Sequence, residues 1–263
     1  MTRSLLSQAE AAFLLAPSGR SGGDCIRAAL LALIAQGRIA VAKQSNPFGG
    51  YELVFGSDKG ADGLLPHLRT VELTLRDRAG SGRLDRAGVL AALQKRFGYG
   101  FGRYVHEHIA PELADLGHVV RLDGKWLGII PRTRYELTST GQKVVAPLLR
   151  ELATLDNLPA LIERSPAHAL QLAHTSGVML VLSPVARRQL PRLRKLMTKD
   201  DTGFGPLVLT GSDSGSVEGF QPHAWSADSE VSSLLDGVAS VCDATSADGG
   251  SDGGGGGDGG GGD

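Results

Sequence analysis

The sequence predicts a mainly α-helical fold with short β-hairpins in winged-helix-like units, followed by a disordered, glycine-rich C-terminal tail. Apolar residues recur at helical spacing through residues 1–202, and short β-prone runs follow the glycines that end the expected helices. By contrast, residues 203–263 hold 17 of the 37 glycines. Such a segment cannot bury enough apolar surface to offset its chain entropy. We therefore expect a helical body over 1–202 and a largely disordered tail over 203–263.

The first predicted unit is a helix followed by a β-hairpin. Asp24 is a suitable N-cap for a helix over residues 25–36, because its carboxylate can accept the free amides of the first turn. Gly37 is placed to end that helix in the left-handed conformation. Residues 39–42 and Tyr51–Phe55 are then expected to pair as two strands.

A second unit repeats this order of elements. A helix is expected over residues 104–116, with a kink or break at Pro111. The Asp123-Gly124 dipeptide is expected to form the turn between strands at 119–122 and 125–130. Helix, glycine, strand, turn and strand in this order are typical of a winged helix, which favours nucleic-acid binding as an alternative function.

Further helices are expected between and after the two units. Ser139 and Gln142 fit a capping box, so a helix should begin at Ser139. Pro147 is expected to bend this helix, because proline lacks an amide proton, and Pro166 and Pro191 lie inside two later predicted helices. The remaining predicted helices cover residues 64–75, 83–94, 158–174 and 187–197.

Formal charge is divided between the body and the tail. All 27 Lys and Arg residues lie in the body, which has 18 acidic residues and a net charge of +9. The tail has 10 acidic residues and no basic one, so the overall charge of −1 is a cancellation. One hypothesis is therefore a scaffold whose acidic tail folds back on the body and competes with anionic ligands.

Composition and motifs exclude several classes of protein. No apolar run approaches the ~20 residues of a membrane-spanning helix, and Cys25 and Cys242 form neither a disulfide framework nor a CxxC motif. His106 and His108 are two residues apart and point to different sides of a helix, and the other histidines, His67 included, show no ligand spacing. We expect a non-enzymatic, cytoplasmic protein without a metal or cofactor, and leave association with a membrane open.

The segment over residues 177–199 combines an apolar run with a cluster of cations. The apolar run is Val178, Met179, Leu180, Val181 and Leu182. The cations that follow are Arg187, Arg188, Arg192, Arg194, Lys195 and Lys199, without an acidic residue among them. An apolar element beside a cationic helix can lie at a membrane surface, where each charge near anionic headgroups contributes about 1 kcal/mol. The alternative is a buried core element beside a solvated helix face.

Residues 97–104 also match part of an RNA-binding pattern. Five of the seven RNP1 positions fit, but the run leads into a predicted helix, whereas RNP1 lies on a sheet. The other interpretation is a glycine-hinged aromatic loop packed on the body.

Several short patches, in the same order along the chain, carry a family resemblance. They are residues 24–26 with 36–39, 57–58 with 63–65, 112–113 with 117–119, 131–138, and 172–178. On these patches the chain resembles the bacterial members of the Golgi phosphoprotein 3 family, over about 195 residues. The resemblance implies a mostly helical fold that recognises phosphatidylinositol 4-phosphate. It also implies a hydrophobic hairpin at the membrane just after the last patch.

Some positions depart from that family. Gly22 stands where the family's headgroup site has a Trp, and Leu31 and Leu161 stand where it has Arg; of these arginine positions, Arg164 alone keeps its residue. The glycine-rich tail is also similar in composition to those of bacterial proteins of unknown function.

These observations lead to one leading hypothesis, a peripheral membrane protein that binds anionic lipid. The predicted headgroup ligands are Arg164, Arg187, Arg188, Arg192, Arg194 and Lys195. The predicted inserting residues are Val178, Met179, Leu180, Val181 and Leu182. Nucleic acid ranks second as a partner, and protein partners and the oligomeric state are left open.

Overall fold

The computed structural model describes residues 6–17, 22–43, 51–56, 63–80, 82–126, 130–176 and 179–199. The predicted tail lies outside these residues, as does Val178. The described part is mainly helical with short antiparallel strand pairs, which confirms the predicted fold class. None of its helices is long and apolar enough to cross a membrane.

The described elements follow one another in this order. They are α1 (Gln8–Leu15), α2 (Gly22–Ala35), β1 (Ile39–Lys43), β2 (Tyr51–Phe55), α3 (Pro66–Ala79), β3 (Arg83–Asp85), α4 (Arg86–Phe97), η1 (Tyr99–Phe101), α5 (Gly102–Tyr104), η2 (Val105–Ile109), α6 (Ala110–Asp115), β4 (Val119–Trp126), β5 (Ile130–Leu137), α7 (Ser139–Leu155), α8 (Leu158–Arg164), α9 (Pro166–Ser176), α10 (Met179–Leu182) and α11 (Pro184–Lys199).

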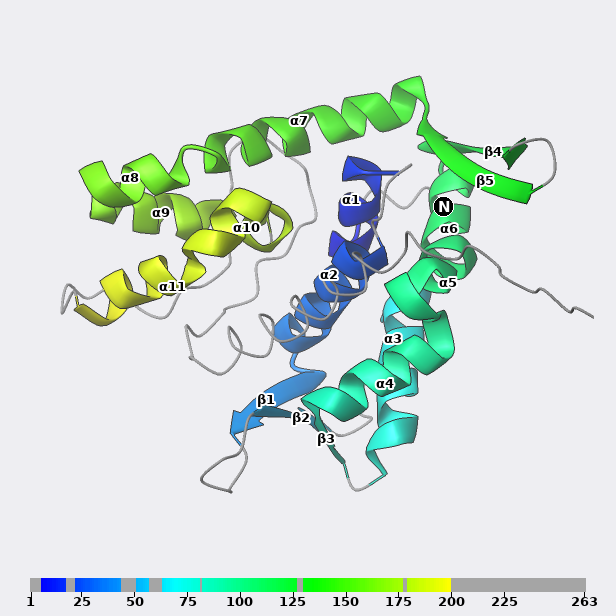
Figure 1. Ribbon diagram of the computed structural model, residues 1–263, viewed down its shortest axis with the longest axis horizontal. Coiled ribbons are helices and arrows are strands. Elements are labelled where there is room, and N and C mark those ends of the chain that lie inside the picture. The colour runs from blue at the N-terminus through cyan, green and yellow to red at the C-terminus, as the bar shows by residue number, and fades with distance from the viewer. Residues whose placement is uncertain are drawn as a thin grey trace, which may run out of the picture.

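Helix α2 runs through the middle of the molecule (Figure 1). Every residue from 25 to 33 is buried, so this helix is covered on all sides. Elements α1, α3, α10 and β1 pack against it, and the α3–α6 helices lie on the side opposite α8, α9 and α11. Because an apolar helix is stable only where other elements surround it, α2 is the centre of the core.

Both ends of α2 follow local chemistry. The helix begins before residue 25, so Asp24 lies in its first turn instead of at the N-cap, and its carboxylate accepts a hydrogen bond from Arg27 Nη1 at 2.6 Å. Gly37 has φ of 66°, as predicted for the residue that ends this helix. The Arg38 amide then donates to the Leu33 carbonyl, and the chain enters β1.

Strands β1, β2 and β3 form one antiparallel sheet in that order. The predicted pairing of β1 with β2 is confirmed, with Ile39 opposite Phe55. The predicted helix over 83–94 is wrong at its start, because Arg83–Asp85 pairs with β2 as strand β3. The Asp85 carboxylate then accepts a hydrogen bond from the Gly88 amide at 2.8 Å and caps α4.

A buried ion pair joins this sheet to α3. Arg38 precedes β1, and its guanidinium donates to both carboxylate oxygens of Glu72 at 3.0–3.2 Å. Arg76 donates to the same carboxylate at 2.9 Å. Removing one partner of such a pair typically costs about 3–5 kcal/mol, because it leaves the other charge buried. The pair therefore fixes α3 against the end of α2.

The helix before the second hairpin contains the predicted irregularity. Residues 102–115 are helical throughout, but Val105–Ile109 is a π-helical segment, and Pro111 lies in the first turn of α6. Proline has no amide proton, and it is tolerated in the first turn of a helix, where that proton would have no partner within the helix.

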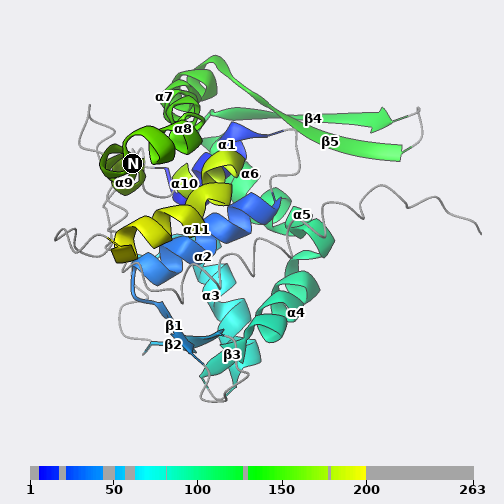
Figure 2. The same cartoon turned by 60° about the vertical axis from the view of Figure 1, so that its left-hand side comes forward.

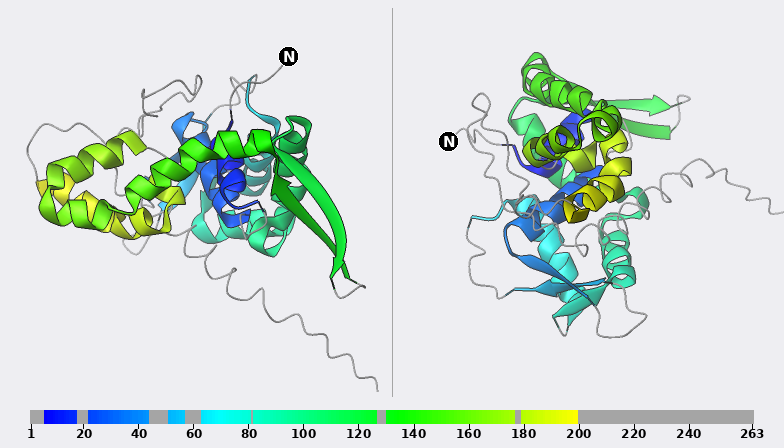
Figure 3. Two further views of the ribbon diagram at one scale, coloured as in Figure 1. Left: turned by 90° about the horizontal axis from the view of Figure 1, so that it is seen from above. Right: turned by 90° about the vertical axis from the view of Figure 1, so that its left-hand side faces the viewer.

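The second hairpin is longer than predicted. Asp123 and Gly124 lie inside β4, opposite Thr133 and Arg132 of β5, and not in the turn. Asp123 is held there because its carboxylate accepts hydrogen bonds from Thr133 Oγ1 at 2.8 Å and from Arg121 Nε at 2.9 Å. The predicted return strand at 125–130 is therefore wrong, and β5 begins at Ile130. Figures 2 and 3 show this hairpin extending away from the helical body.

The C-terminal helices form a group at one end of the molecule (Figures 1 and 3). The predicted helix over 158–174 is broken at Ser165, before Pro166, into α8 and α9. By contrast, α7 and α11 continue through Pro147 and Pro191. The short helix α10 connects the group to α2.

Helix α7 is anchored to the second hairpin by Thr138. Its N-cap is Thr138 and not the predicted Ser139: the Thr138 hydroxyl accepts from the Gly141 amide at 3.0 Å and donates to the Gly117 carbonyl at 2.6 Å. Gly141 lies directly against the His118 carbonyl, so a Cβ at position 141 would overlap that oxygen.

We predict that Gly141→Ala lowers the free energy of unfolding by about 2 kcal/mol or more, because the backbone of two elements must separate. Gly102→Ala is the matched control: Gly102 is helical, and the nearest atom to an added Cβ is His106 Cδ2 at 4.0 Å. This control should be neutral or stabilise by up to about 1 kcal/mol. Urea denaturation of both variants measures the difference, and equal effects would contradict the predicted contact.

A second prediction concerns Glu151 on α7. Desolvation raises the pKa of its carboxyl from 4.5 to about 7. Because the folded-state pKa is the higher one, the stability that this group contributes is complete below about pH 4 and is lost as the pH rises through about 7. Glu151→Gln should therefore raise the free energy of unfolding at about pH 8 by on the order of 1 kcal/mol, a value discounted for partial exposure, and by less at about pH 5.

Urea denaturation at the two pH values measures this difference. Glu136→Gln, on an exposed position of β5, is the control and should show the same small effect at both. A Glu151→Gln effect independent of pH would show that burial does not disfavour the charged carboxylate.

Candidate functional site

Helix α11 presents cations on one side and apolar residues on the other. Ala186 and Leu193 are buried in the core, whereas Arg188, Arg192 and Lys195 are exposed. These three cations are spaced by four and three residues, so they share one helix face. The sequence folds this way because the apolar positions of α11 pack against α8, α9 and α10.

The end of α8 adds a fourth exposed cation. Arg192 Nη1 lies 3.9 Å from Glu163 Oε1, which places this part of α11 beside the end of α8, where Arg164 is exposed. We call the exposed residues Arg164, Arg188, Arg192 and Lys195 the basic face. Residues 158–199 contain seven Lys or Arg and a single acidic residue, Glu163. An exposed pair such as Arg192–Glu163 contributes little, so the basic face keeps a positive charge.

Arg187 does not belong to the basic face. Its side chain is 19% exposed, and Nη1 lies 3.9 Å from Oδ1 of Asp24, the same oxygen that binds Arg27. Arg187 is therefore turned toward the start of α2. Arg194 lies within α11, and its side chain is outside the described residues.

The predicted inserting residues are part of the core. Met179, Leu180, Val181 and Leu182 are only 1–8% exposed and form α10, which packs against α2, α7, α9 and α11. Because these residues are buried, the prediction that they insert into a membrane is wrong, and they form the core element that was the alternative. The physical reason is that α2 needs an apolar neighbour on the side of α10. Val178 lies outside the described residues.

The positions of the family's headgroup site do not form a cationic pocket. A Cβ at Gly22 would overlap the Gly100 carbonyl oxygen, so no larger side chain fits there without movement of the backbone. Leu31 is fully buried, and Leu161 is partly buried. Of these positions, Arg164 alone offers an exposed charge.

The aromatic run over 97–104 packs on the body, as one of the two interpretations expected. Phe97, Phe101 and Tyr104 are buried, and Tyr99 is exposed. The run forms helical turns around glycine hinges and contains no strand, which excludes the sheet arrangement that RNP1 requires.

The two histidines at 106 and 108 point to different places. The His106 ring stacks on Tyr135, with Nδ1 3.2 Å from the phenol oxygen. The His108 ring lies edge-on to Phe97, with 6.0 Å between the ring centroids. Burial, with nearby arginines, lowers the pKa of both imidazoles.

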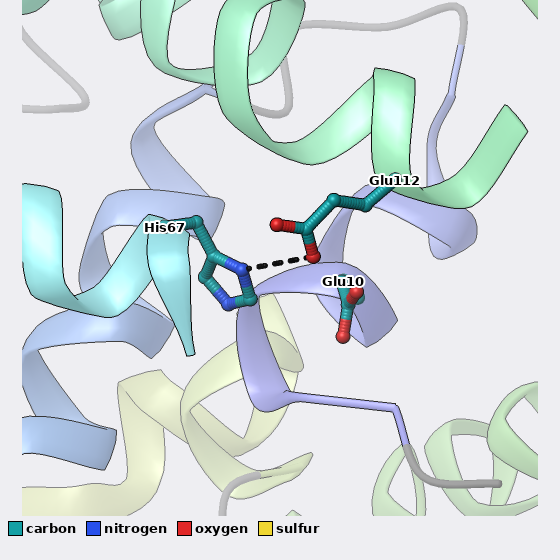
Figure 4. Close-up of side chains that lie close together, drawn as sticks. All are labelled: Glu10, His67 and Glu112. Carbon is teal, nitrogen blue, oxygen red and sulfur yellow. Dashed lines mark ion pairs between the residues drawn. The ribbon is translucent and has the colours of Figure 1, made fainter. Parts of the chain in front are cut away.

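Sequence reasoning missed a second polar cluster, beside α2. Glu10 of α1, His67 of α3 and Glu112 of α6 point toward one another (Figure 4). Glu10 and His67 are fully buried, and the Glu112 side chain is 27% exposed. We call these residues the Glu–His–Glu cluster. No short motif could reveal it, because the three residues are far apart in the chain and the fold alone brings them together.

The comparisons with known proteins add no relative. A comparison with protein-family models and a search of curated proteins both found no match to this chain. A functional assignment therefore has to come from the residues themselves.

Proposed function

We propose that this chain is a non-enzymatic peripheral membrane protein that binds anionic lipid through the basic face. The observation that carries the proposal is the exposed row of Arg188, Arg192 and Lys195 on a helix without an acidic residue, beside the exposed Arg164. Such a row can lie flat against a negatively charged surface, and all of its cations can meet headgroups at once.

Electrostatics alone gives a moderate, reversible affinity. Four cations at about 1 kcal/mol each contribute on the order of 4 kcal/mol near an anionic surface. The apolar side of α11 is used in the core, so it adds no insertion energy. Binding should therefore weaken as salt is added, because exposed charges are screened over about 10 Å at moderate ionic strength.

Specificity for phosphatidylinositol 4-phosphate is the finer form of this proposal. The family resemblance is its sole support, and the chain lacks the Trp of that site and two of its three Arg residues, with Gly22, Leu31 and Leu161 at these positions. All four residues of the basic face are exposed, so we favour recognition of negative surface charge over recognition of one headgroup. Vesicles matched in charge, with phosphatidylserine or with phosphatidylinositol 4-phosphate, should bind equally.

The surface charges around the second hairpin support the winged-helix alternative less well than the basic face supports lipid binding. The β4–β5 hairpin exposes Arg121 and Arg134, but Arg121 is paired with Asp123. The helix before the hairpin exposes Glu107 and Asp115 as well as basic residues. Acidic residues among these cations weaken the attraction for a phosphate backbone, whereas helix α11 of the basic face contains no acidic residue.

The test is co-sedimentation of the full chain with vesicles. Wild type should pellet with phosphatidylserine-rich vesicles and not with neutral phosphatidylcholine vesicles. Charge reversal of Arg188, Arg192 and Lys195 to Glu should lower the affinity by at least about 100-fold, since three favourable charges become repulsive. High salt should release the wild-type protein.

A matched control keeps the change in net charge constant. Arg69 and Arg78 on α3 and Lys95 on α4 are exposed on the other side of α2, and their reversal to Glu should leave vesicle binding nearly unchanged. Equal losses in both triple variants would show that net charge, and not the basic face, drives binding. Wild-type binding to a DNA duplex but not to anionic vesicles would favour the winged-helix alternative instead.

A further inference from the structure

The Glu–His–Glu cluster brings together side chains of a kind that bind metal ions. Glu10, His67 and Glu112 each offer one ligand atom, and these three atoms lie within 4.8 Å of one another. Two ligands bound to one ion at about 2.1 Å are at most about 4.2 Å apart, so shifts of the order of 1 Å would close the site around an ion. Side-chain rotation can supply shifts of that size.

His67 is the member that most needs a partner. Its side chain is fully buried, and within the described residues neither ring nitrogen has a hydrogen-bond partner. Nδ1 faces Glu112 Oε2 at 3.5 Å, which is longer than a good hydrogen bond (Figure 4). A buried imidazole without hydrogen bonds is costly, and a metal ion at Nδ1 would give that nitrogen a partner.

The carboxylate of Glu10 is held in place by the chain around it. The Ser7 amide donates to Oε2 of Glu10 at 2.6 Å, and the Glu10 amide donates to the Ser7 hydroxyl at 3.1 Å in a capping box. A second group that orients a ligand in this way is common around metal ions. Glu112 completes the set and is partly exposed, so an ion can reach the cluster from solvent along its side chain.

The surroundings of the cluster also fit a cation. Glu10 is fully buried and the Glu112 side chain is 27% exposed, so both carboxylates lie in a space with little water. Two carboxylates in such a space favour a positive ion between them.

We propose that Glu10, His67 and Glu112 form a mononuclear binding site for a divalent transition metal of the Zn²⁺ class. One imidazole nitrogen and two carboxylate oxygens suit Zn²⁺, Fe²⁺ or Mn²⁺ better than Mg²⁺ or Ca²⁺, which prefer oxygen ligands alone. Three protein ligands leave at least one position for water. The ion would join α1, α3 and α6, whereas the basic face lies on α8 and α11.

The test is titration of the full chain with Zn²⁺ after removal of metals by a chelator. Wild type should bind one equivalent, and Co²⁺ at the same site should give visible absorption bands. Zn²⁺ at about 100-fold above Kd should raise Tm by about 5–10 °C. Mg²⁺ should do neither.

Variants separate the proposed ligands from other roles. Glu112→Gln should weaken Zn²⁺ binding by at least about 10-fold and abolish the rise in Tm. Glu10→Gln should do the same although Gln preserves the capping box, which separates ligation from capping. His67→Gln tests the third ligand; if that variant fails to fold, the two Gln variants decide the question.

His168→Gln is the control, because His168 is exposed on α9 and away from the cluster. It should bind Zn²⁺ like wild type. Wild-type affinity in Glu10→Gln and Glu112→Gln, or the absence of stoichiometric Zn²⁺ binding by the wild type, would overturn the proposal.

Discussion

The complete burial of α2 is the constraint on which the rest of the structure depends. Nine consecutive residues, 25–33, are buried, so α2 needs apolar neighbours in every direction. Helices α1 and α3 and the start of the first sheet supply one side, and α10 supplies another. Arg27 lies within this buried stretch, and its 2.6 Å bond to Asp24 keeps a charge at the start of the helix, where Arg187 of α11 also approaches. The C-terminal helices are therefore tied to the core by charge as well as by apolar packing.

This constraint also separates two roles that the sequence places next to each other. The apolar run and the cations are neighbours along the chain, and a membrane surface would suit both. In the folded protein residues 179–182 of the run form α10 in the core, and the exposed cations remain on α8 and α11. A short apolar run thus indicates that its residues are buried, but it does not indicate whether they are buried in a membrane or in the protein core. Here they are buried in the core, because α2 needs apolar neighbours. What remains at the surface is a set of charges, which interact over a longer range and are screened by salt.

The sequence predicts features that depend on neighbouring residues, and it fails where a distant partner decides. Gly37 and the β1–β2 hairpin follow from local chemistry and are confirmed, whereas the single helix predicted over 158–174 is broken before Pro166. Asp123-Gly124 is a strong turn signal, but hydrogen bonds from the opposite strand hold Asp123 in β4. Arg188, Arg192 and Lys195 on α11 are exposed, as is Arg164. The spacing of charged and apolar residues along a helix can be read from the sequence, and it determines which residues of α11 face outward. The Glu–His–Glu cluster is non-local, so neither spacing nor composition could reveal it.

The two proposed sites differ in physical character, and this difference makes them independent. The basic face acts through exposed charges, whose attraction to an anionic surface falls with ionic strength. The Glu–His–Glu cluster acts through ligand bonds in a mostly buried space, which salt screens far less. The cluster is formed by residues of α1, α3 and α6, whereas the basic face lies on α8 and α11. Salt should therefore release the protein from vesicles without releasing a metal ion, and loss of the ion should leave the charges of the basic face where they are.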